Sequence, residues 1–328
     1  MREKFPVFDL HCDTATELVL QNQSWEKNSL QLDLDRASKL MSHIQIYAFC
    51  CVYDREFKPL PPSEAEAQFF TAVSNFYTEL ERHKATHRLC RSTEDMIAAV
   101  GEGKHPVLLS LEGPEAIGCD PWRLDELKDL GFVMTTLTWN FRNALAGSHL
   151  TGEGLSPEGK AFVRRAQDLG LVIDVSHLSD KAFWDLVDVT SAPIVASHSN
   201  SRAVCPHSRN LTDEQFKVIR NFRGVVGLNL YAPFLNESGR ADFSDVKRHL
   251  DHFIDLGGEN YISLGGDLDG CDVLPEGFTG VDSWNDLGRY LLDRGMEEEQ
   301  VLGVMNNNAS RFFLQNLQKK RVGEFTAD

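Results

Sequence analysis

The sequence predicts a (β/α)8 TIM barrel with C-terminal helices, and two patterns lead to this α/β fold class. Eight short runs are continuously apolar rather than alternating, as strands are in a parallel sheet buried on both faces. Helical patterns separate these runs along the chain, which is typical of βα units. Because α/β barrels commonly reach this length as one unit, residues 1–328 are expected to form a single domain.

The eight expected strands fit a closed barrel better than an open doubly wound sheet. An open sheet that binds a nucleotide needs a glycine-rich turn after a strand, and the sequence contains no such motif. A proline-containing stretch at residues 57–66 is expected to form a loop after the second strand, on the rim where barrel active sites lie. The strands are expected at residues 6–12, 44–52, 106–111, 132–138, 171–176, 193–197, 224–230 and 261–265.

Capping residues mark where the helices are expected to begin. Ser63, Ser92 and Ser244 each precede a helical pattern and are expected N-caps. Thr212 and Gln215 have the spacing of a capping box, in which each side chain bonds the other residue's backbone N–H. The helices are expected at residues 64–83, 93–100, 158–169, 216–222, 245–256, 282–294 and 297–313.

Charge and cysteine content argue against several classes of protein. The formal net charge of −16 disfavours a nucleic-acid partner, because such proteins carry a basic patch. The seven cysteines are scattered without a CxxC pair, as expected for reduced thiols in the cytoplasm. No apolar stretch approaches the ~20 residues of a membrane-spanning helix. The N-terminus enters an apolar strand at once, so no signal peptide is expected there.

Five of the expected strands end in side chains that bind divalent metal ions. In a parallel barrel all strands point the same way, so residues at their C-terminal ends converge at one rim. One such ending would mean little, but five in one chain predict a metal site at that rim. The candidate residues are His11, Asp13, Glu112, His177, His198, Asp267 and Asp269.

Spacing supports these candidates, although each has a simpler explanation. His11 and Asp13 are two residues apart on a strand and face the same side, yet HxD is common by chance. Glu112 would be costly to bury unless one or two metal ions neutralised it, and otherwise it is a solvated rim residue. His177 and His198 end consecutive strands about 5 Å apart, which favours a shared metal over two structural histidines. Imidazole and carboxylate groups are both zinc ligands.

Other residues near these strand ends are candidates for proton transfer and substrate binding. Asp267 ends the last strand and is favoured as general base over Asp269, which lies further into the loop. Arg209 has the fork geometry that binds a carboxylate, unless it is a solvated loop arginine. Trp139 and Asn140 are expected to line the pocket, unless Trp139 packs in the core. No role is assigned to two loop histidines, His149 and His207.

Taken in order, six motifs make the chain resemble the membrane dipeptidase (renal dipeptidase) family of the amidohydrolase superfamily. They are HxD on the first strand, SLEG with Glu112, DVSH with His177, SHS with His198, SRN with Arg209 and GGDLDG with Asp267. The resemblance runs nearly end to end. It implies a (β/α)8 barrel that holds two zinc ions per chain.

The resemblance also implies a role for each matching residue. His11 and Asp13 would bind one zinc ion, His177 and His198 would bind the other, and Glu112 would bridge them. Arg209 would hold the C-terminal carboxylate of a substrate, and Asp267 would transfer protons.

The chain departs from the family in three ways, one of which is that the loop after the second strand, which shapes the pocket, has no motif that matches the family. Animal members are secreted, disulfide-linked and lipid-anchored, whereas this chain is expected to be cytoplasmic and free of a signal or anchor. Those members have a substrate-contacting His where this chain has Trp139, which changes how the scissile carbonyl is polarised and which substrates fit.

The combined expectation is a zinc-dependent dipeptidase in which a zinc-bound hydroxide attacks a dipeptide with a free C-terminal carboxylate and Asp267 shuttles the proton. The alternatives are another amidohydrolase-type hydrolase acting on lactones, amides or phosphoesters, a catalytically silent metal- or peptide-binding barrel, and a metal-free barrel. The expected partner is a small dipeptide, with no nucleic acid and no membrane. The sequence leaves side-chain preference, chirality and oligomeric state open, a homodimer included.

Overall fold

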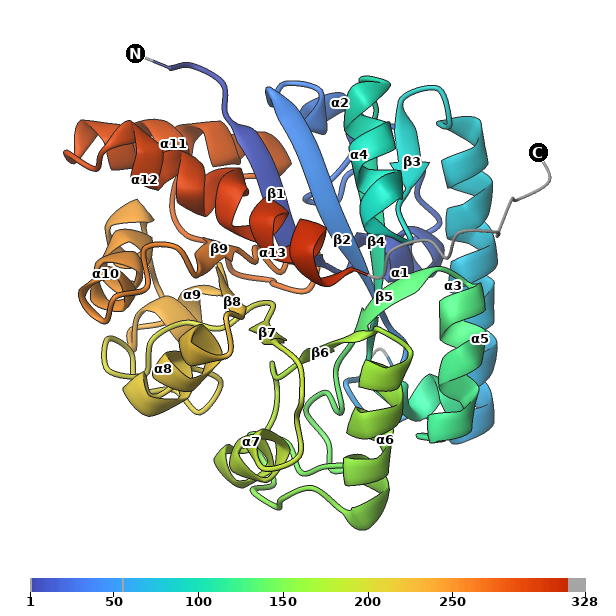
Figure 1. Ribbon diagram of the computed structural model, residues 1–328. Coiled ribbons are helices and arrows are strands. Elements are labelled where there is room, and N and C mark those ends of the chain that lie inside the picture. The colour runs from blue at the N-terminus through green and yellow to red at the C-terminus, as the bar shows by residue number, and fades with distance from the viewer. Residues whose placement is uncertain (1, 55, 318–328) are drawn as a thin grey trace.

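Eight parallel strands close into a barrel in the computed structural model, which describes residues 2–54 and 56–317 (Figure 1). Around the barrel the order is β1, β2, β4, β5, β6, β7, β8 and β9, and the β1–β9 and β2–β4 pairings complete it. The (β/α)8 fold is therefore confirmed. The strands are β1 (Pro6–Cys12), β2 (Ser42–Cys50), β3 (His87–Leu89), β4 (His105–Glu112), β5 (Phe132–Thr135), β6 (Val172–Asp174), β7 (Ile194–Ala196), β8 (Val225–Leu228) and β9 (Ile262–Leu264).

β3 is an additional strand that the sequence did not predict. It pairs only with β4 among the described strands, through contacts such as His87 with His105, and lies outside the barrel. Its three residues are too few to show a pattern. The expected strand at 132–138 also ends early, because β5 stops at Thr135 and the chain turns into a loop.

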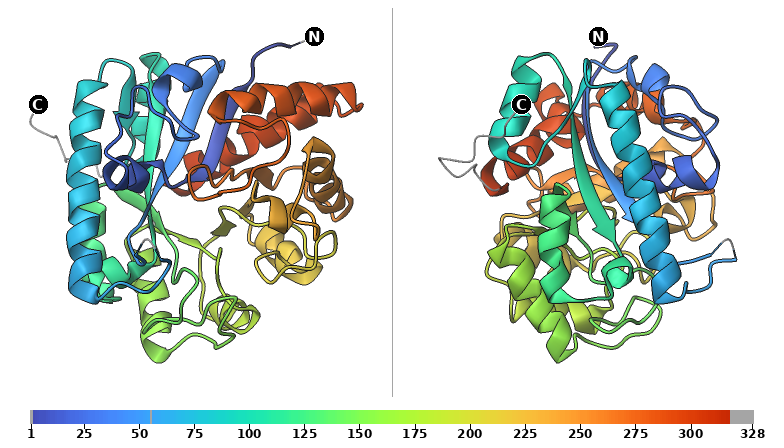
Figure 2. Two further views of the ribbon diagram at one scale, coloured as in Figure 1. Left: turned by 180° about the vertical axis from the view of Figure 1, so that it is seen from behind. Right: turned by 90° about the vertical axis from the view of Figure 1, so that its right-hand side faces the viewer.

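Helices surround the barrel, as the two views of Figure 2 show. None of them, in the part of the chain that is described, is long and apolar enough to cross a membrane. The α-helices are α1 (Thr14–Leu20), α2 (Leu34–Ala37), α3 (Pro62–Arg82), α4 (Thr93–Gly101), α5 (Leu124–Asp129), α6 (Pro157–Asp168), α7 (Asp180–Val187), α8 (Asp213–Asn221), α9 (Ala232–Leu235), α10 (Phe243–Asp255), α11 (Trp284–Asp293), α12 (Glu298–Leu302) and α13 (Asn308–Asn316).

Two of the expected helix starts are confirmed and two are wrong. Ser92 caps α4, and Thr212 forms a capping box with Gln215 at the start of α8. Ser63 is not a cap, because α3 already begins at Pro62, a position where the missing N–H of proline costs nothing. The loop expected at 57–66 therefore ends before Pro62. Ser244 lies inside α10, whose N-cap is the preceding aspartate, Asp242. The expected helix at 297–313 is divided by a π-helical turn, Gly303–Asn307.

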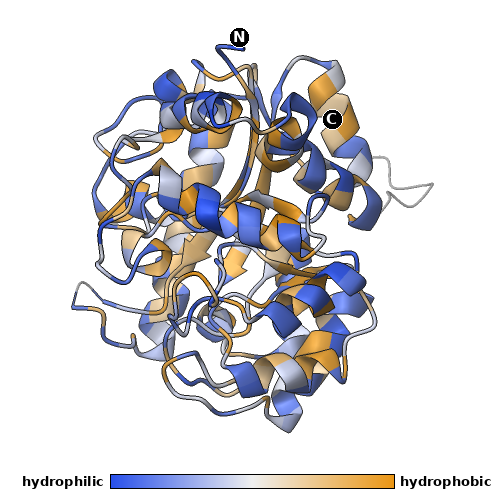
Figure 3. Ribbon diagram, turned by 90° about the vertical axis from the view of Figure 1, so that its left-hand side faces the viewer, coloured by the Kyte–Doolittle hydropathy of each residue, from blue (hydrophilic) through white to orange (hydrophobic). Residues whose placement is uncertain are grey.

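The barrel interior is closed at one end by α13. One cluster of buried side chains draws residues from seven barrel strands, and only the inside of a barrel brings so many strands together. Phe312 and Phe313 of α13 belong to this cluster, and the ring of Phe313 lies 5.3 Å from that of Phe8. Figure 3 shows the strands as mainly hydrophobic and the helices as mixed. Polar side chains such as His11 and Glu112 lie at the C-terminal ends of the strands, at the opposite end of the barrel from α13.

Candidate metal centre

The predicted site residues converge at the C-terminal ends of the barrel strands. His11 and Glu112 lie in the last two residues of β1 and β4, and His198 follows β7 by two residues. A cavity of about 470 Å³ opens above them. Its lining includes Asp13, Tyr53, Phe57, Glu112, Trp139, Asn140, Phe141, His149, Leu150, His177, His207, Arg209, Tyr231, Phe234, Asp267, Gly270 and Asp272.

Glu112 stands between two groups of ligands, and its two carboxylate oxygens face different ones. Oε1 lies 2.8 Å from Nε2 of His177 and 3.5 Å from Nε2 of His198. Oε2 lies 3.3 Å from Nε2 of His11. A carboxylate that divides its oxygens in this way has the arrangement of a bridge between two metal ions.

Hydrogen bonds behind the imidazoles hold their Nε2 atoms toward Glu112. Nδ1 of His177 lies 2.9 Å from Oδ1 of Asn140, so Nδ1 carries the proton and Nε2 offers its lone pair. Nδ1 of His198 lies 2.6 Å from Oγ of Ser197, which donates its own proton to the buried carboxylate of Asp174. Asp174 and Ser197 are not among the site residues predicted from the sequence.

His11, Asp13 and Asp267 lie together on the other side of Glu112. Nε2 of His11 lies 3.9 Å from Oδ1 of Asp13 and 3.7 Å from Oδ1 of Asp267. His11 Nε2 and Asp13 Oδ1 are buried and make no hydrogen bond with any described residue. Buried atoms of this kind need a partner, and a divalent cation satisfies both a nitrogen lone pair and a carboxylate oxygen.

The electrostatics of the centre favour a positive charge. Burial lowers the pKa of His11, but Glu112, Asp13 and Asp267 outweigh burial and raise this pKa to about 10. Burial raises the pKa of Glu112, whereas His11 and His177 hold it well below its usual range. The carboxylates therefore hold a proton on an imidazole inside the protein. The carboxylates of Asp13 and Glu112 and the three neighbouring imidazoles are donor groups that suit zinc.

Strained backbone holds two of these residues in place. His177 has φ of 71° and Asp267 has φ of 55°, a left-handed conformation that non-glycine residues rarely adopt. Gly270 lets the next turn pass close to the carboxylates, since a Cβ there would lie 2.2 Å from Oδ2 of Asp13 and 2.4 Å from Oδ1 of Asp267.

The two candidate bases, Asp267 and Asp269, lie in different surroundings. Asp267 lines the cavity, and its Oδ2 accepts a hydrogen bond of 2.9 Å from Nδ2 of Asn229. Asp269 is absent from the cavity lining. Its oxygens accept hydrogen bonds of 2.5 Å from Oγ1 of Thr14 and from the backbone N–H of Gln31, so it ties a loop to α1.

The cavity has a cationic side and an aromatic side. Arg209 is 5% exposed, and its guanidinium donates to the carbonyl of His198 at 3.3 Å, beside the ligands. Trp139 stacks on Tyr53 with ring centroids 4.2 Å apart, so it lines the pocket rather than the core. His149, to which sequence reasoning gave no role, also lines the cavity and lies 3.0 Å from Oδ1 of Asn140.

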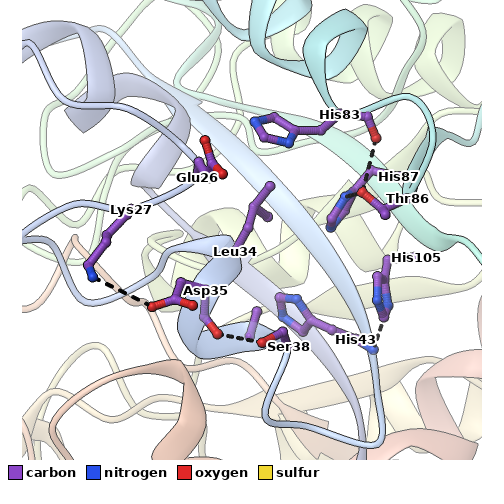
Figure 4. A pocket seen from close by; sticks show the side chains of 11 residues that line it. Glu26, Lys27, Leu34, Asp35, Ser38, His43, His83, Thr86, His87 and His105 are labelled. Atoms are coloured by element: carbon purple, nitrogen blue, oxygen red, sulfur yellow. Dashed lines mark hydrogen bonds and ion pairs between the residues drawn. The ribbon is translucent and has the colours of Figure 1, made fainter.

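A second cavity, of about 580 Å³, lies at the opposite ends of the strands (Figure 4). Four imidazoles line it, and two of them, His43 and His105, stand at the starts of β2 and β4. Burial and the neighbouring His105 lower the pKa of His43 to about 3, so this imidazole is neutral near pH 7. Among the described residues, each group of three or more ligating atoms within 4.8 Å of one another lies at the other end of the barrel.

Comparison with known sequences identifies the family. The family model described as membrane dipeptidase (peptidase family M19) matches residues 1–323. An uncharacterized protein in the PQQ-III 3′ region of Acinetobacter calcoaceticus is 32% identical over 283 residues, covering 76% of this chain and 89% of the relative. The uncharacterized dipeptidase C965.12 of Schizosaccharomyces pombe is 30% identical over 336 residues, covering 93% of this chain and 79% of the relative.

Solved structures lead to the same family. A metallo peptidase from Rhodobacter sphaeroides, liganded with a phosphinate mimic of the dipeptide L-Ala-D-Ala, matches with a TM-score of 0.88 at 28% identity, over 96% of this chain and 100% of that chain. The dipeptidase AC, a metallo peptidase of family M19, matches with a TM-score of 0.88 at 30% identity, over 96% of this chain and 99% of that chain. The chain therefore belongs to the membrane dipeptidase family of metallopeptidases, peptidase family M19.

Proposed function

We propose that the protein is a binuclear zinc dipeptidase that hydrolyses dipeptides with a free C-terminal carboxylate. The observation that carries this proposal is Glu112, whose two oxygens face His11 on one side and His177 with His198 on the other. His11 and Asp13 would hold one ion, and the other two histidines would hold the second. Two bound zinc ions supply an activated water near neutral pH and polarise the scissile carbonyl.

The chain's own residues would bind and orient the substrate. Arg209 is buried against the cavity, so its guanidinium meets a carboxylate with little competition from water. Asp267 lines the same cavity as Arg209, and its carboxylate would take a proton and return it to the leaving amine of a dipeptide held there. Trp139 and Tyr53 would enclose one substrate side chain.

We also place the protein in the cytoplasm as part of this proposal. All seven cysteines are buried and unpaired, which suits a reducing compartment. The oligomeric state, a homodimer included, is left to a mass measurement in solution.

The proposal is tested by metal analysis together with a substrate panel. The zinc-reconstituted protein is expected to hold two ions per chain and to hydrolyse members of a panel of L,L and L,D dipeptides. Glu112→Gln is expected to weaken both sites together, because both depend on the same carboxylate. One ion or none per chain would contradict the binuclear centre, and hydrolysis of lactones or phosphoesters alone would contradict the dipeptidase assignment.

A further inference from the structure

The end of β2 carries a cysteine where the neighbouring strands carry metal ligands. β2 lies between β1 and β4 in the barrel, and Cys50, its last residue, is the register partner of Glu112. Paired residues of neighbouring strands point to the same face of a sheet. The side chain of Cys50 therefore faces the centre together with that of Glu112.

The sulfur of Cys50 lies among ligand atoms. Its Sγ and one carboxylate oxygen each from Asp13 and Glu112 are all within 4.8 Å of one another. Cys50 is 3% exposed, so this thiol is enclosed with the carboxylates. Oδ1 of Asp13 is one of the buried atoms without a hydrogen bond to any described residue. A cation bound by the carboxylate of Asp13 would therefore lie close to the sulfur.

We propose that Cys50 is a sixth protein ligand of the metal centre, adding a thiolate to the ion held by His11 and Asp13. The inference rests on the proposed metal centre. On binding, the Sγ–H bond breaks, its proton passes to water, and an Sγ–metal bond forms with no change of oxidation state. A soft thiolate favours zinc or cobalt over magnesium or manganese, so it would restrict which ion occupies this side.

Two other cysteines near the centre make matched controls. Cys51 is the next residue along the chain and is fully buried, but alternation places its side chain on the opposite face of β2. The Sγ of Cys271 lies 3.4 Å from Oδ2 of Asp267, where it serves as a hydrogen-bond donor to a carboxylate. Serine at each of these positions removes a buried thiol without removing the proposed ligand.

The test uses the full chain reconstituted with cobalt(II), in which a bound thiolate gives a charge-transfer absorption band in the near ultraviolet. The unaltered protein, Cys51→Ser and Cys271→Ser are expected to show the band, and Cys50→Ser is expected to lose it. X-ray absorption of the zinc-loaded, unaltered protein should show sulfur at about 2.3 Å from zinc, a measurement that needs no variant to fold.

Each of the other outcomes would contradict either the proposed function or the proposed role of Cys50. Binding of no metal would overturn the proposed function. Two bound ions and dipeptide hydrolysis without sulfur near zinc would overturn the role of Cys50 alone. Loss of the band in Cys271→Ser and its retention in Cys50→Ser would show that the wrong thiol is named. If Cys50→Ser does not fold, Cys50→Ala is compared with Cys51→Ala in the same way.

Discussion

Asp267→Asn is expected to remove most of the hydrolysis while leaving the centre in place. Oδ2 of Asp267 accepts a hydrogen bond of 2.9 Å from Asn229, and an asparagine keeps an oxygen for this bond. The other oxygen, Oδ1, faces the cavity 3.7 Å from Nε2 of His11. An amide group placed there is unable to accept a proton, so only the chemical role of the side chain is lost.

The size of the effect follows from these contacts. Loss of a general acid–base lowers rates by ~10²–10⁴-fold, or ~3–5 kcal/mol of activation free energy. The free energy of unfolding should change by less than the ~1 kcal/mol of one hydrogen bond, because the bond from Asn229 is kept. The neighbouring carboxylate of Asp13 also loses a like charge, which offsets part of any cost.

The assay is kcat for one dipeptide, measured at zinc contents matched by elemental analysis. Asp269→Asn is the control, because Asp269 bonds Thr14 and Gln31 outside the cavity and should affect stability rather than kcat. If Asp269→Asn is inactive and Asp267→Asn is near normal, the wrong carboxylate has been chosen. If both variants keep near-normal turnover, neither Asp267 nor Asp269 transfers the proton.

The remaining predictions concern substrate binding, metal affinity and acid stability. Arg209→Met is expected to lower kcat/KM by about 10–100-fold for free dipeptides but not for C-terminally amidated ones, since one charge-assisted hydrogen bond is worth ~1.5–3 kcal/mol; equal losses would remove its carboxylate role. Ser197→Ala is expected to weaken zinc binding by about 10–100-fold in chelator competition, because Ser197 bonds the imidazole of His198. Ser110→Ala is the control and should leave zinc binding unchanged, since the buried hydroxyl of Ser110 makes no hydrogen bond to any described residue. Burial lowers the pKa of His43 and His87 to about 3, so their contribution to stability is complete above about pH 6.5 and is lost as the pH falls toward 3. The free energy of unfolding from urea titrations should therefore fall more between about pH 7 and about pH 5 in the unaltered protein than in His43→Gln, by up to ~2 kcal/mol for this imidazole. Equal falls would contradict a neutral, buried His43.

The barrel was predictable because each of its strands is apolar on both faces. Continuous apolar runs identify such strands without knowledge of their partners, and polar residues at the ends of the runs then indicate the rim. β3 could not be found in this way, because its three residues, His87–Leu89, are too few to show a period. The start of α10 was misplaced by two residues, because Asp242 and Ser244 are both good capping residues and only geometry selects between them.

The proposed metal ligands were easier to predict from the sequence than the residues that position their side chains. His177 and His198 end apolar runs, which sets them apart in the sequence. Asn140 and Ser197 act through hydrogen bonds to these imidazoles, and a polar residue in a loop or beside a histidine has no distinguishing pattern. The sequence around Cys50 carries no metal-binding pattern, because the residues that precede it in β2 are mainly apolar. Its closeness to Glu112 depends on the register of β2 against β4, which the sequence does not display.

The pairing between the first and last strands, β1 and β9, has fewer register pairs than any other pairing of barrel strands. β1 and β9 share one register pair, Asp9 with Leu264, and the backbone N–H of Asp267 then donates to the carbonyl of His11 at 3.1 Å. His11 and Asp13, which would hold one ion, lie on the β1 side of this pairing, and His198, which would help to hold the other, follows β7. Two ions bridged by Glu112 would therefore crosslink the first strand to a strand far along the chain. Such a crosslink closes a chain loop that spans most of the protein, and its effect on the entropy of the unfolded chain is correspondingly large. Removal of the ions should therefore release amide protons at β1 and β9 for exchange before those of β4, and unfolding would begin where the chain's first and last strands meet.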